Sequence, residues 1–410
     1  ITLANYHDPQ RSPLSSADLL ASAEQFEDNH FYPLFSSVIE EALAVHQPVY
    51  VGLSLSYLSQ ALPAFAVAGF LRRHHPQIRI IAGGGLISSW MSSPAWSEPF
   101  RGLFDYCIAG PGEKPLLQLC GQESDSALGR FCYDDYTMTA YLSPGAILPY
   151  SASHGCYWQK CQFCPDFAEG SCYTAKPASA ALAEIDKLIH THHPALVHLL
   201  DNAVSPALLR ELAGSGMTVP WYGFARCEKE LEDFDFCAAL KQSGCVMLKL
   251  GLESGSAQVL ERLNKGVDPE RAARILGNLH RAGIGAYVYL LFGTPAETES
   301  EALLTLDFVR RNWEAISYLN LAIFNMPVCS PEAVQLQNRF SDGDLSLYCD
   351  FVHPGGWDRK AVRNFLQKRF RRDPLVRAIE RRSPGVFGSN HAPFLLHSYR
   401  EPRSGLRYSI

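Results

Sequence analysis

Three cysteines stand within nine residues of one another in this chain, as Cys156, Cys161 and Cys164. Three thiolates on one loop can bind three of the four irons of a cubane iron–sulfur cluster, and the fourth iron then stays open to another ligand. A structural zinc site almost always takes four protein ligands, and the next cysteine, Cys172, follows eight residues later with no second cysteine beside it. The spacing therefore favours an iron–sulfur cluster with an open iron, with zinc as the alternative.

The composition is that of a globular protein of two or three domains. The chain has 410 residues, of which 47% are hydrophobic and 19% are charged, and its formal net charge is −6. Such a charge gives no general attraction to nucleic acid or to an anionic membrane, so neither partner is expected. The apolar runs are also shorter than the roughly 20 residues that a membrane-spanning helix needs.

The use of cysteine indicates a reducing compartment. Twelve cysteines are spread mostly singly through apolar stretches, which is typical of buried, reduced thiols in a cytoplasmic protein and not of a disulfide framework. The first residue is Ile and the first six residues look like the end of a strand. We therefore expect that the extreme N-terminus, and any targeting segment in it, precedes this numbering.

The N-terminal part, residues 1–130, is expected to be an α/β domain with a Rossmann-like parallel sheet. Residues 48–56 and 78–85 have the apolar pattern of buried strands, 61–74 has helical periodicity, and 104–110 is a third strand. Ligands of such sheets bind at the carboxyl ends of the strands. Small residues that would let a large flat ligand approach gather there: Ser54, Ser56, Gly83, Gly84, Gly85 and Gly110. Tight turns are the alternative explanation for the glycines, and the dinucleotide pattern Gly-x-Gly-x-x-Gly is absent.

The central part, residues 131–328, alternates strands with helices. The expected strands begin at Ile147 and continue at 196–202, 221–226, 246–255, 285–295 and 316–326. The expected helices are 178–193, 204–213, 229–243, 256–282 and 299–313. Six β/α units in about 180 residues are too few for a closed eight-stranded barrel, so we expect a partial (β/α)6 barrel of the TIM type.

Polar side chains stand where these strands end. Asp201, Arg226 and Glu253 each lie at the tip of a strand, and the cysteine loop follows the first strand. Because functional groups of such barrels gather at the carboxyl ends of the strands, we expect these side chains and the three cysteines to face one cavity.

The cysteine loop, with the aromatic Phe163 before its last cysteine, and the strand tips that follow resemble the radical S-adenosylmethionine (radical SAM) superfamily. The N-terminal βαβ unit and the run Gly-Leu-Glu-Ser-Gly at 251–255 make residues 45–330 similar to the branch with a cobalamin (B12)-binding-type domain before the barrel. Two features depart from the family pattern. The usual loop is Cys-x3-Cys-x2-Cys, whereas the first gap here is four residues, and an Asp-x-His-x-x-Gly run, whose histidine ligates cobalt, is absent.

The resemblance implies that the cysteine triplet holds a [4Fe–4S] cluster whose open iron binds S-adenosylmethionine. One electron from a donor such as flavodoxin or ferredoxin would then lead to a 5′-deoxyadenosyl radical, which abstracts hydrogen from an unactivated carbon. The residues implied to contact S-adenosylmethionine are Phe163, Asp201, Arg226, Glu253, Ser254, Gly293 and Pro295. The residues implied to contact cobalamin are Ser54, Ser56, Gly83, Gly84, Gly85 and Gly110.

The function expected from the resemblance is methyl transfer to, or rearrangement at, a carbon of a small molecule or peptide. A cobalamin-independent radical SAM enzyme, whose N-terminal domain is only a scaffold, is one alternative. A non-enzymatic metal-binding scaffold is another. An RNA methylthiotransferase would need a second cluster, and the chain has no second closely spaced cysteine triplet.

The C-terminal part, residues 329–410, is expected to be a mostly helical or irregular substrate or capping region. Residues 350–359 are rich in turn formers and in side chains able to contact a ligand, and 363–382 is strongly basic. The basic stretch is either a solvated helical face or a docking site for RNA, an acidic peptide or the electron donor. Residues 389–394 are expected to form a loop that closes the barrel mouth, with His391 as a possible proton donor.

Overall fold

The computed structural model describes residues 6–122, 129–136, 141, 143–217, 219–336, 343–384 and 391–400. The chain forms two compact units, which we treat separately. The first comprises residues 1–127, 168–171 and 325–352, and the second comprises 128–167, 172–324 and 353–410. The division into three domains drawn from the sequence stays a prediction.

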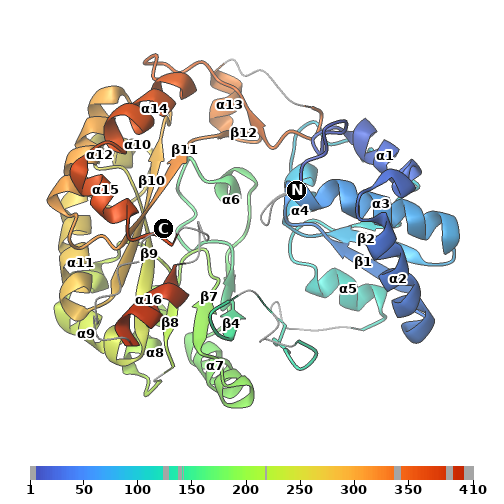
Figure 1. The fold of residues 1–410 in the computed structure, drawn as a ribbon, viewed down its shortest axis with the longest axis horizontal. Coiled ribbons are helices and arrows are strands. Elements are labelled where there is room, and N and C mark those ends of the chain that lie inside the picture. The colour runs from blue at the N-terminus through green and yellow to red at the C-terminus, as the bar shows by residue number, and fades with distance from the viewer. Residues whose placement is uncertain are drawn as a thin grey trace, which may run out of the picture. The chain divides into compact units, whose positions relative to one another are not determined.

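The first unit contains the expected parallel sheet, with strand order β1-β2-β3; Figure 1 labels β1 and β2. Strands β1 (Tyr50–Ser54) and β2 (Arg79–Gly83) pair over their whole length and are joined by helix α3 (Leu58–His74). The βαβ unit read from the apolar pattern is therefore confirmed. Strand β3 (Tyr106–Cys107) is shorter than expected, because only two residues of β2 pair with it. Two short helices follow strands β2 and β3, α4 (Gly85–Met91) and α5 (Glu113–Leu119).

Helices that the sequence analysis did not single out complete the core of the first unit. They are α1 (Ser16–Glu24), the 3-10 turn η1 (Phe26–Asp28) and α2 (Tyr32–His46). Helix α1 packs very closely on α3, since a Cβ added at Gly69 would lie 1.8 Å from the carbonyl oxygen of Ala23. Residues 325–352 contribute α13 (Pro331–Gln335) and an antiparallel pair, β12 (Met326–Pro327) with β13 (Tyr348–Cys349).

The second unit is built on a six-stranded, fully parallel sheet with the order β11-β10-β9-β8-β7-β4. Its strands are β4 (Ile147–Tyr150), β7 (Leu196–Leu199), β8 (Trp221–Ala225), β9 (Cys245–Glu253), β10 (Gly285–Phe292) and β11 (Tyr318–Ile323). These are the six expected strands, and no pairing joins β4 to β11 in the described part of the chain. The open, partial barrel is thus the architecture that the alternating pattern predicted.

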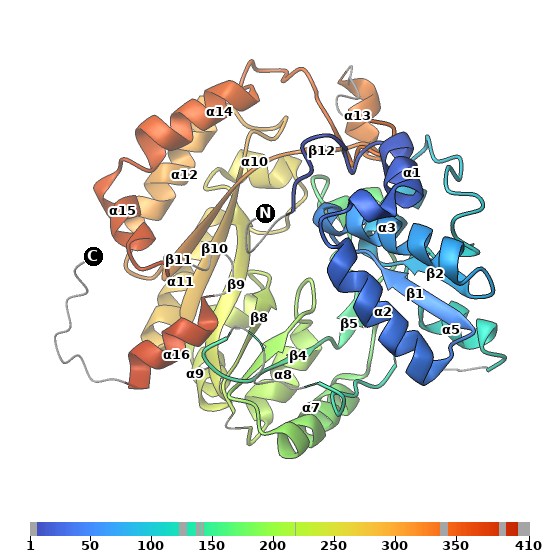
Figure 2. The same ribbon diagram turned by 45° about the vertical axis from the view of Figure 1, so that its right-hand side comes forward.

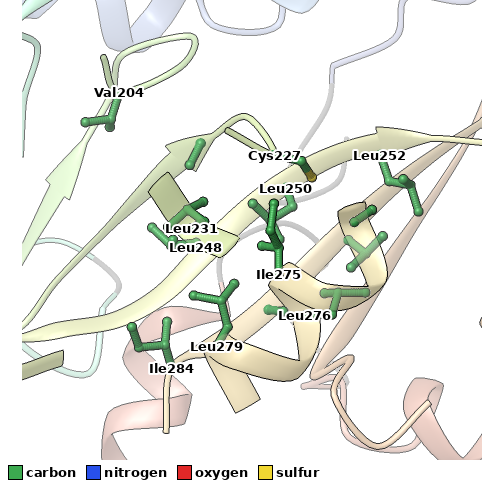
Figure 3. Close-up of a cluster of buried hydrophobic side chains, with 14 of the residues drawn as sticks. Val204, Cys227, Leu231, Leu248, Leu250, Leu252, Ile275, Leu276, Leu279 and Ile284 are labelled. Atoms are coloured by element: carbon green, nitrogen blue, oxygen red, sulfur yellow. The ribbon is translucent and has the colours of Figure 1, made fainter. Parts of the chain in front are cut away.

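Helices cover the outer face of this sheet, where alternate strand residues are apolar. They are α7 (Ala178–His192), α8 (Pro206–Gly214), α9 (Phe234–Gln242), α10 (Ala257–Arg262), α11 (Pro269–Ala282) and α12 (Glu299–Arg311). Figure 3 shows Leu248 and Leu250 of β9 directed toward Ile275 and Leu279 of α11. Burial of such side chains contributes roughly 1.5–3 kcal/mol each, so this face holds the main core.

Two expected helices are interrupted. The stretch 256–282 divides into α10 and α11, because Asn264 (φ 53°) and Gly266 (φ 72°) adopt the left-handed conformation, which ends a helix. The stretch 229–243 begins as a 3-10 turn, η3 (Lys229–Glu232). It resumes as α9 after Asp233, whose side chain accepts a hydrogen bond from the backbone N–H of Asp235.

The C-terminal residues of the second unit are helical, as expected. Helix α14 (Arg359–Phe365) continues into a π-helical turn, η4 (Leu366–Phe370), and is followed by α15 (Pro374–Glu380) and α16 (Ala392–Arg400). Helix α16 lies against β9 on the face of the sheet opposite α9 and α11 (Figures 1 and 2). No helix in the described ranges has both the length and the apolarity needed to cross a membrane.

The basic stretch 363–382 makes ion pairs within its own unit. Arg369 pairs with Glu299 at 3.3 Å, and Arg371 pairs with Glu380 at 2.6 Å. Apolar side chains of the same helices, such as Phe370, are fully buried in the core. These contacts agree with a solvated helical face that packs on the barrel.

Candidate radical site at the carboxyl end of the sheet

The cysteine loop is held between two short strands and a helical turn. Strand β5 (Ser153–His154) precedes the loop, α6 (Pro165–Ala168) ends it, and β6 (Thr174–Ala175) returns antiparallel to β5. Gly155 is required at the start of the loop, because its φ is +71° and an added Cβ would lie 2.7 Å from the carbonyl oxygen of Cys172. The conformation of Gly155 therefore fixes the direction in which the cysteine loop leaves strand β5.

Cys161 is the most enclosed cysteine of the triplet. Its side chain is buried, and the Arg226 guanidinium donates to its sulfur through Nη1 at 3.9 Å. Burial raises the pKa of the Cys161 thiol, and the nearby positive charges of Lys265 and Arg226 partly oppose this rise. Burial likewise raises the pKa of Cys164 to about 11. A metal that binds the thiolates would offset this desolvation.

Arg226 is fixed from several sides. Its Nε donates to Glu228 at 3.1 Å, its Nη2 donates to the backbone carbonyl of Lys265, and its guanidinium lies 4.2 Å from the ring centroid of Trp158. Trp158 in turn donates from Nε1 to the carbonyl oxygen of Asn264 at 2.9 Å. The arginine thus braces the cysteine loop against the turn between α10 and α11, whereas its contact with S-adenosylmethionine, implied by the resemblance, stays a prediction.

An ion pair lies beside the cysteine loop. Lys265 Nζ is 2.8 Å from Glu253 Oε1, and both side chains are largely buried. Burial alone would lower the pKa of Lys265, but the charges of Glu253 and Cys161 raise it overall, so the lysine is an ammonium. The same ammonium lies 5.4 Å from the ring centroid of Phe163. Three expected site residues, Glu253, Phe163 and Cys161, therefore surround one lysine that sequence reasoning missed.

Asp201 and Ser254 are engaged in contacts with the protein itself. Asp201 is buried and accepts hydrogen bonds from the Ala152 N–H at 3.2 Å and the Ser153 hydroxyl at 2.5 Å, and burial raises its pKa. Ser254 is fully buried, with its hydroxyl 3.2 Å from that of Thr305. In this structure Asp201 anchors the entry to the cysteine loop, and Ser254 joins the end of β9 to α12.

The loop after β10 is held by a buried carboxyl group. Gly293 (φ 81°) donates from its backbone N–H to Glu297 Oε2 at 2.6 Å, and Trp357 Nε1 donates to the same oxygen at 3.0 Å. Burial raises the pKa of Glu297 to about 7. His353 completes the support, because its Nε2 is 2.9 Å from the Thr294 carbonyl oxygen. The expected S-adenosylmethionine contacts at Gly293 and Pro295 thus belong to a firmly held backbone.

Several of these supporting residues were not identified from the sequence. Glu297 was missed, although a carboxylate four residues after a strand-terminal glycine is a possible signal. Lys265 stands between Asn264 and Gly266, whose types mark a helix end, so that break was detectable. Trp158 offered no signal, since its partners lie far along the chain.

His391 lies elsewhere than expected. Its ring centroid is 4.7 Å from that of Tyr287 and 4.5 Å from that of Tyr318, near the amino ends of β10 and β11. Helix α16, which follows it, also contacts an amino end, because a Cβ added at Gly285 would lie 2.7 Å from Leu395. The expectation that this histidine closes the mouth is therefore wrong. Residues 389 and 390 of the expected loop lie outside the described residues.

In the first unit, the residues expected to contact cobalamin gather at the carboxyl edge of its sheet. Gly84 (φ 96°) packs on Leu55, where an added Cβ would lie 2.5 Å from the carbonyl oxygen. Gly110 (φ 74°) donates from its N–H to the Ser88 hydroxyl at 2.8 Å, and an added Cβ would meet nothing within 4 Å. The remaining members, Ser54, Ser56, Gly83 and Gly85, are exposed or half-buried. This edge leaves backbone open to a large ligand.

The donor set of the cysteine loop suits a cluster. All three thiols are free, and they stand on one loop beside two cationic side chains. No group of three or more His, Cys, Asp or Glu side chains in the described ranges is arranged around a single ion. Thiolates of a cubane cluster bind different irons, so they are spread more widely than the ligands of one ion.

Comparison with known proteins agrees with this geometry. Residues 227–309 match the Radical SAM superfamily model. The chain is 24% identical to an uncharacterized methyltransferase of Pyrococcus horikoshii over 189 residues, which cover 44% of this chain and 40% of that protein. It is 31% identical to bacteriochlorophyllide d C-12(1)-methyltransferase of Chlorobaculum tepidum over 72 residues, which cover 17% of this chain and 16% of that protein. The chain thus spans less than half the length of these curated relatives.

Two solved structures share the fold over most of the chain. The radical S-adenosylmethionine methyltransferase TsrM of Kitasatospora setae superposes with a TM-score of 0.57 at 17% identity, covering 83% of this chain and 78% of that one. The cobalamin-dependent S-adenosylmethionine radical enzyme OxsB superposes with a TM-score of 0.52 at 17% identity, covering 70% of this chain and 46% of that one. Residues 227–309 therefore match the Radical SAM superfamily model, and the chain shares the fold of these two radical S-adenosylmethionine enzymes.

Proposed function

We propose that this chain is a cobalamin-binding radical SAM enzyme that transfers a methyl group to, or rearranges, an unactivated carbon of a small molecule or peptide. One observation carries the proposal: a loop with three free cysteines stands at the carboxyl end of a parallel sheet, next to Arg226 and Lys265. The methyltransferase names of both curated relatives support the reaction class.

The cluster would be held by Cys156, Cys161 and Cys164, with S-adenosylmethionine beside Phe163 and Glu253. When bound, the cluster and S-adenosylmethionine supply a carbon radical, and cobalamin supplies a carrier for a methyl group. The protein's own residues position and shield these groups. Arg226 and Lys265 place two positive charges beside the Cys161 sulfur, which stabilises the negative charge of a thiolate there. Their burial keeps water away from the cysteine loop.

Glu253 is the residue best placed to recognise an amino acid moiety. Its Oε1 forms an ion pair with the Lys265 ammonium. A carboxylate has further lone pairs that can accept hydrogen bonds from an ammonium or a hydroxyl of the ligand. The backbone at Gly293 and Pro295 would contact the adenine of S-adenosylmethionine. The hydrogen bond from the Gly293 N–H to Glu297 would keep this backbone in place.

The first unit would bind cobalamin through the open carboxyl edge at Ser54, Ser56, Gly83, Gly84, Gly85 and Gly110. The solved relatives support this part of the proposal, because TsrM was solved with cobalamin and a [4Fe–4S] cluster and OxsB with aqua-cobalamin. A small-molecule substrate is supported by the tryptophan bound to TsrM. An electron donor of the flavodoxin or ferredoxin type is required by this chemistry. The twelve cysteines, which are spread mostly singly through the sequence, support a cytoplasmic location.

The test is anaerobic reconstitution of the chain with iron and sulfide, followed by incubation with S-adenosylmethionine, a reductant and hydroxocobalamin. We expect about four irons per chain, corrinoid retained through gel filtration, and both 5′-deoxyadenosine and S-adenosylhomocysteine by mass spectrometry. Cys161→Ala should lose iron and 5′-deoxyadenosine together, whereas Cys237→Ala, a core cysteine, should keep both. Formation of 5′-deoxyadenosine without retained corrinoid would refute the cobalamin part of the proposal and indicate a cobalamin-independent radical SAM enzyme. Absence of bound iron would refute it.

A further inference from the structure

A buried lysine lies on the inner face of the six-stranded sheet. Lys249 is in the middle of β9, and its neighbours along the strand, Leu248 and Leu250, point to the opposite, helix-covered face. Only 5% of Lys249 is exposed. A lysine at such a position is uncommon, because its ammonium loses most of its hydration.

Aromatic rings surround the ammonium. Nζ of Lys249 lies 4.9 Å from the ring centroid of Phe224 and 5.3 Å from that of Tyr222. His198 stacks on Tyr222, with ring centroids 4.1 Å apart, and Tyr289 packs on Phe224 at 5.0 Å. Cation–π contacts of this kind stabilise a desolvated ammonium by up to about 2 kcal/mol, much less than its loss of hydration.

No carboxylate in the described residues forms an ion pair with Lys249, whereas the other strongly buried lysine, Lys265, has Glu253 at 2.8 Å. Burial lowers the pKa of Lys249 to about 8, so at neutral pH it is still mostly protonated. The two histidines near Lys249, His198 and His391, carry no negative charge that could balance its ammonium. Burial and the charge of Lys249 lower the pKa of His198 to about 4, and the same causes lower that of His391. The inner face of the sheet therefore carries one positive charge, on Lys249, with which no carboxylate of the described residues forms an ion pair.

The inner face leads from Lys249 directly to the candidate radical site. The next residue of β9 on the same face is Gly251, and a Cβ added there would lie 2.7 Å from Glu253 Oε1 and 2.9 Å from Lys265 Nζ. Two residues of a strand span about 7 Å. A molecule held at Lys249 would thus reach with its other end toward the ion pair beside the cysteine loop.

We propose that the Lys249 ammonium binds an oxyanion of the substrate, a carboxylate or a phosphate, while the substrate's planar apolar body lies on the ring of Phe224, which is half-buried, whereas Tyr222 is fully buried. This assignment rests on the proposed function and narrows its substrate class. Gly251 has no side chain, and the Lys265–Glu253 ion pair takes the place that one would need, so the pair comes next after Lys249 on this face. An oxyanion would supply the counter-charge that the protein itself lacks at this position.

The experiment uses the reconstituted full chain and matched pairs of ligands. Each pair is an aromatic acid and its primary amide, for example 3-phenylpropionate and 3-phenylpropanamide, over about twenty different ring systems, with phenyl phosphate and phenol as a phosphate arm. Binding is measured by isothermal titration calorimetry. The variants are Lys249→Met, Lys249→Arg, and Lys187→Met as a control on the exposed face of α7, and circular dichroism checks that each is folded.

We expect that ring systems which bind the wild type do so about tenfold more tightly as the anion than as the neutral partner, in keeping with one charge-assisted hydrogen bond. Lys249→Met should lose this preference, Lys249→Arg should retain much of it, and Lys187→Met should not change it. Preference in the acid arm identifies a carboxylate, and preference in the phosphate arm identifies a phosphate.

The inference is overturned if the wild type shows no preference in either arm, or if Lys249→Met keeps the preference. Iron content and 5′-deoxyadenosine formation are measured on the same wild-type preparation. A preparation that has iron and forms 5′-deoxyadenosine, yet shows no preference for anions, refutes the role of Lys249 alone. A preparation that binds no iron refutes the proposed function instead.

Discussion

Lys265 and Glu253 form a 2.8 Å ion pair across the end of β9, and the pair occupies the space that a side chain at residue 251 would need. Both side chains are largely buried, and removal of one partner from such a pair leaves the other charge without compensation. The pair also lies beside Phe163 and Cys161. It therefore links the packing of the sheet to the cysteine loop.

We expect Lys265→Met to lower the free energy of unfolding by about 3 kcal/mol, because Glu253 is left buried and unpaired. The double variant Glu253→Gln/Lys265→Met should lose less than the sum of the two single changes, since it buries no charge. Urea denaturation of the metal-free chain measures all four proteins of this cycle. Strictly additive losses would contradict a coupled pair.

Arg226→Lys should weaken the cysteine loop while leaving the sheet folded. Lysine keeps the charge but cannot contact Glu228, the Lys265 carbonyl and Cys161 at once. We expect less iron per chain after reconstitution, with an unchanged far-ultraviolet circular dichroism spectrum. Arg210→Lys is the matched control, because Arg210 is an exposed arginine with a long contact to Glu230. Equal iron content in both variants would show that the brace is dispensable.

Gly266→Ala tests the contact between the cysteine loop and the turn after α10. A Cβ at residue 266 would lie 2.2 Å from the Trp158 ring, and the backbone there has φ +72°. We expect a loss of about 1–3 kcal/mol in the free energy of unfolding, together with weaker iron retention. Gly277→Ala in α11, where an added Cβ meets nothing within 4 Å, should instead stabilise the chain by up to about 1 kcal/mol.

Glu297 makes the stability depend on pH. Burial raises its pKa from 4.5 to about 7, so between these values the folded chain retains a proton that the unfolded chain has released. Its contribution is therefore fully present below pH 4.5 and is lost as pH rises through about 7, by an amount of about 3 kcal/mol. The free energy of unfolding measured at pH 5, 6, 7 and 8 should fall less steeply in Glu297→Gln, which cannot ionise. The exposed Glu314→Gln should keep the wild-type slope, and parallel curves for all three proteins would refute the assignment.

The strands were readable from the sequence because each is a nearly continuous apolar run, as expected for a parallel sheet covered on its outer face. Their carboxyl ends then located Asp201, Arg226 and Glu253 near the cysteine loop without any knowledge of contacts. The partners of these residues were not readable in this way. Trp158 meets Arg226 and Asn264 only through tertiary folding, and local sequence carries no trace of such a contact.

Lys249 illustrates a second limit. In the run Val246–Leu252 it is one charged residue among apolar ones, and the strand pattern alone does not tell whether the lysine faces a solvated surface or a buried wall. The distinction comes from residues on β7, β8 and β10, whose rings close around it. Helix α16 is a similar case, because its apolar residues are compatible with either end of the barrel.

The position of α16 has a kinetic consequence. Pro393 and Leu396 line a small apolar cavity of about 80 Å³ with Ile147 and Leu196, so the helix packs on the amino ends of β4 and β7. Because this helix covers the amino ends, the proposed binding at Lys249 places the route to it at the carboxyl end of the sheet. A molecule that reaches Lys249 lies deeper than one beside Glu253, and the deeper occupant has to arrive first and depart last. Under the proposed function, with S-adenosylmethionine beside Glu253 and the substrate at Lys249, we therefore expect a compulsory order of addition in which the substrate binds before S-adenosylmethionine.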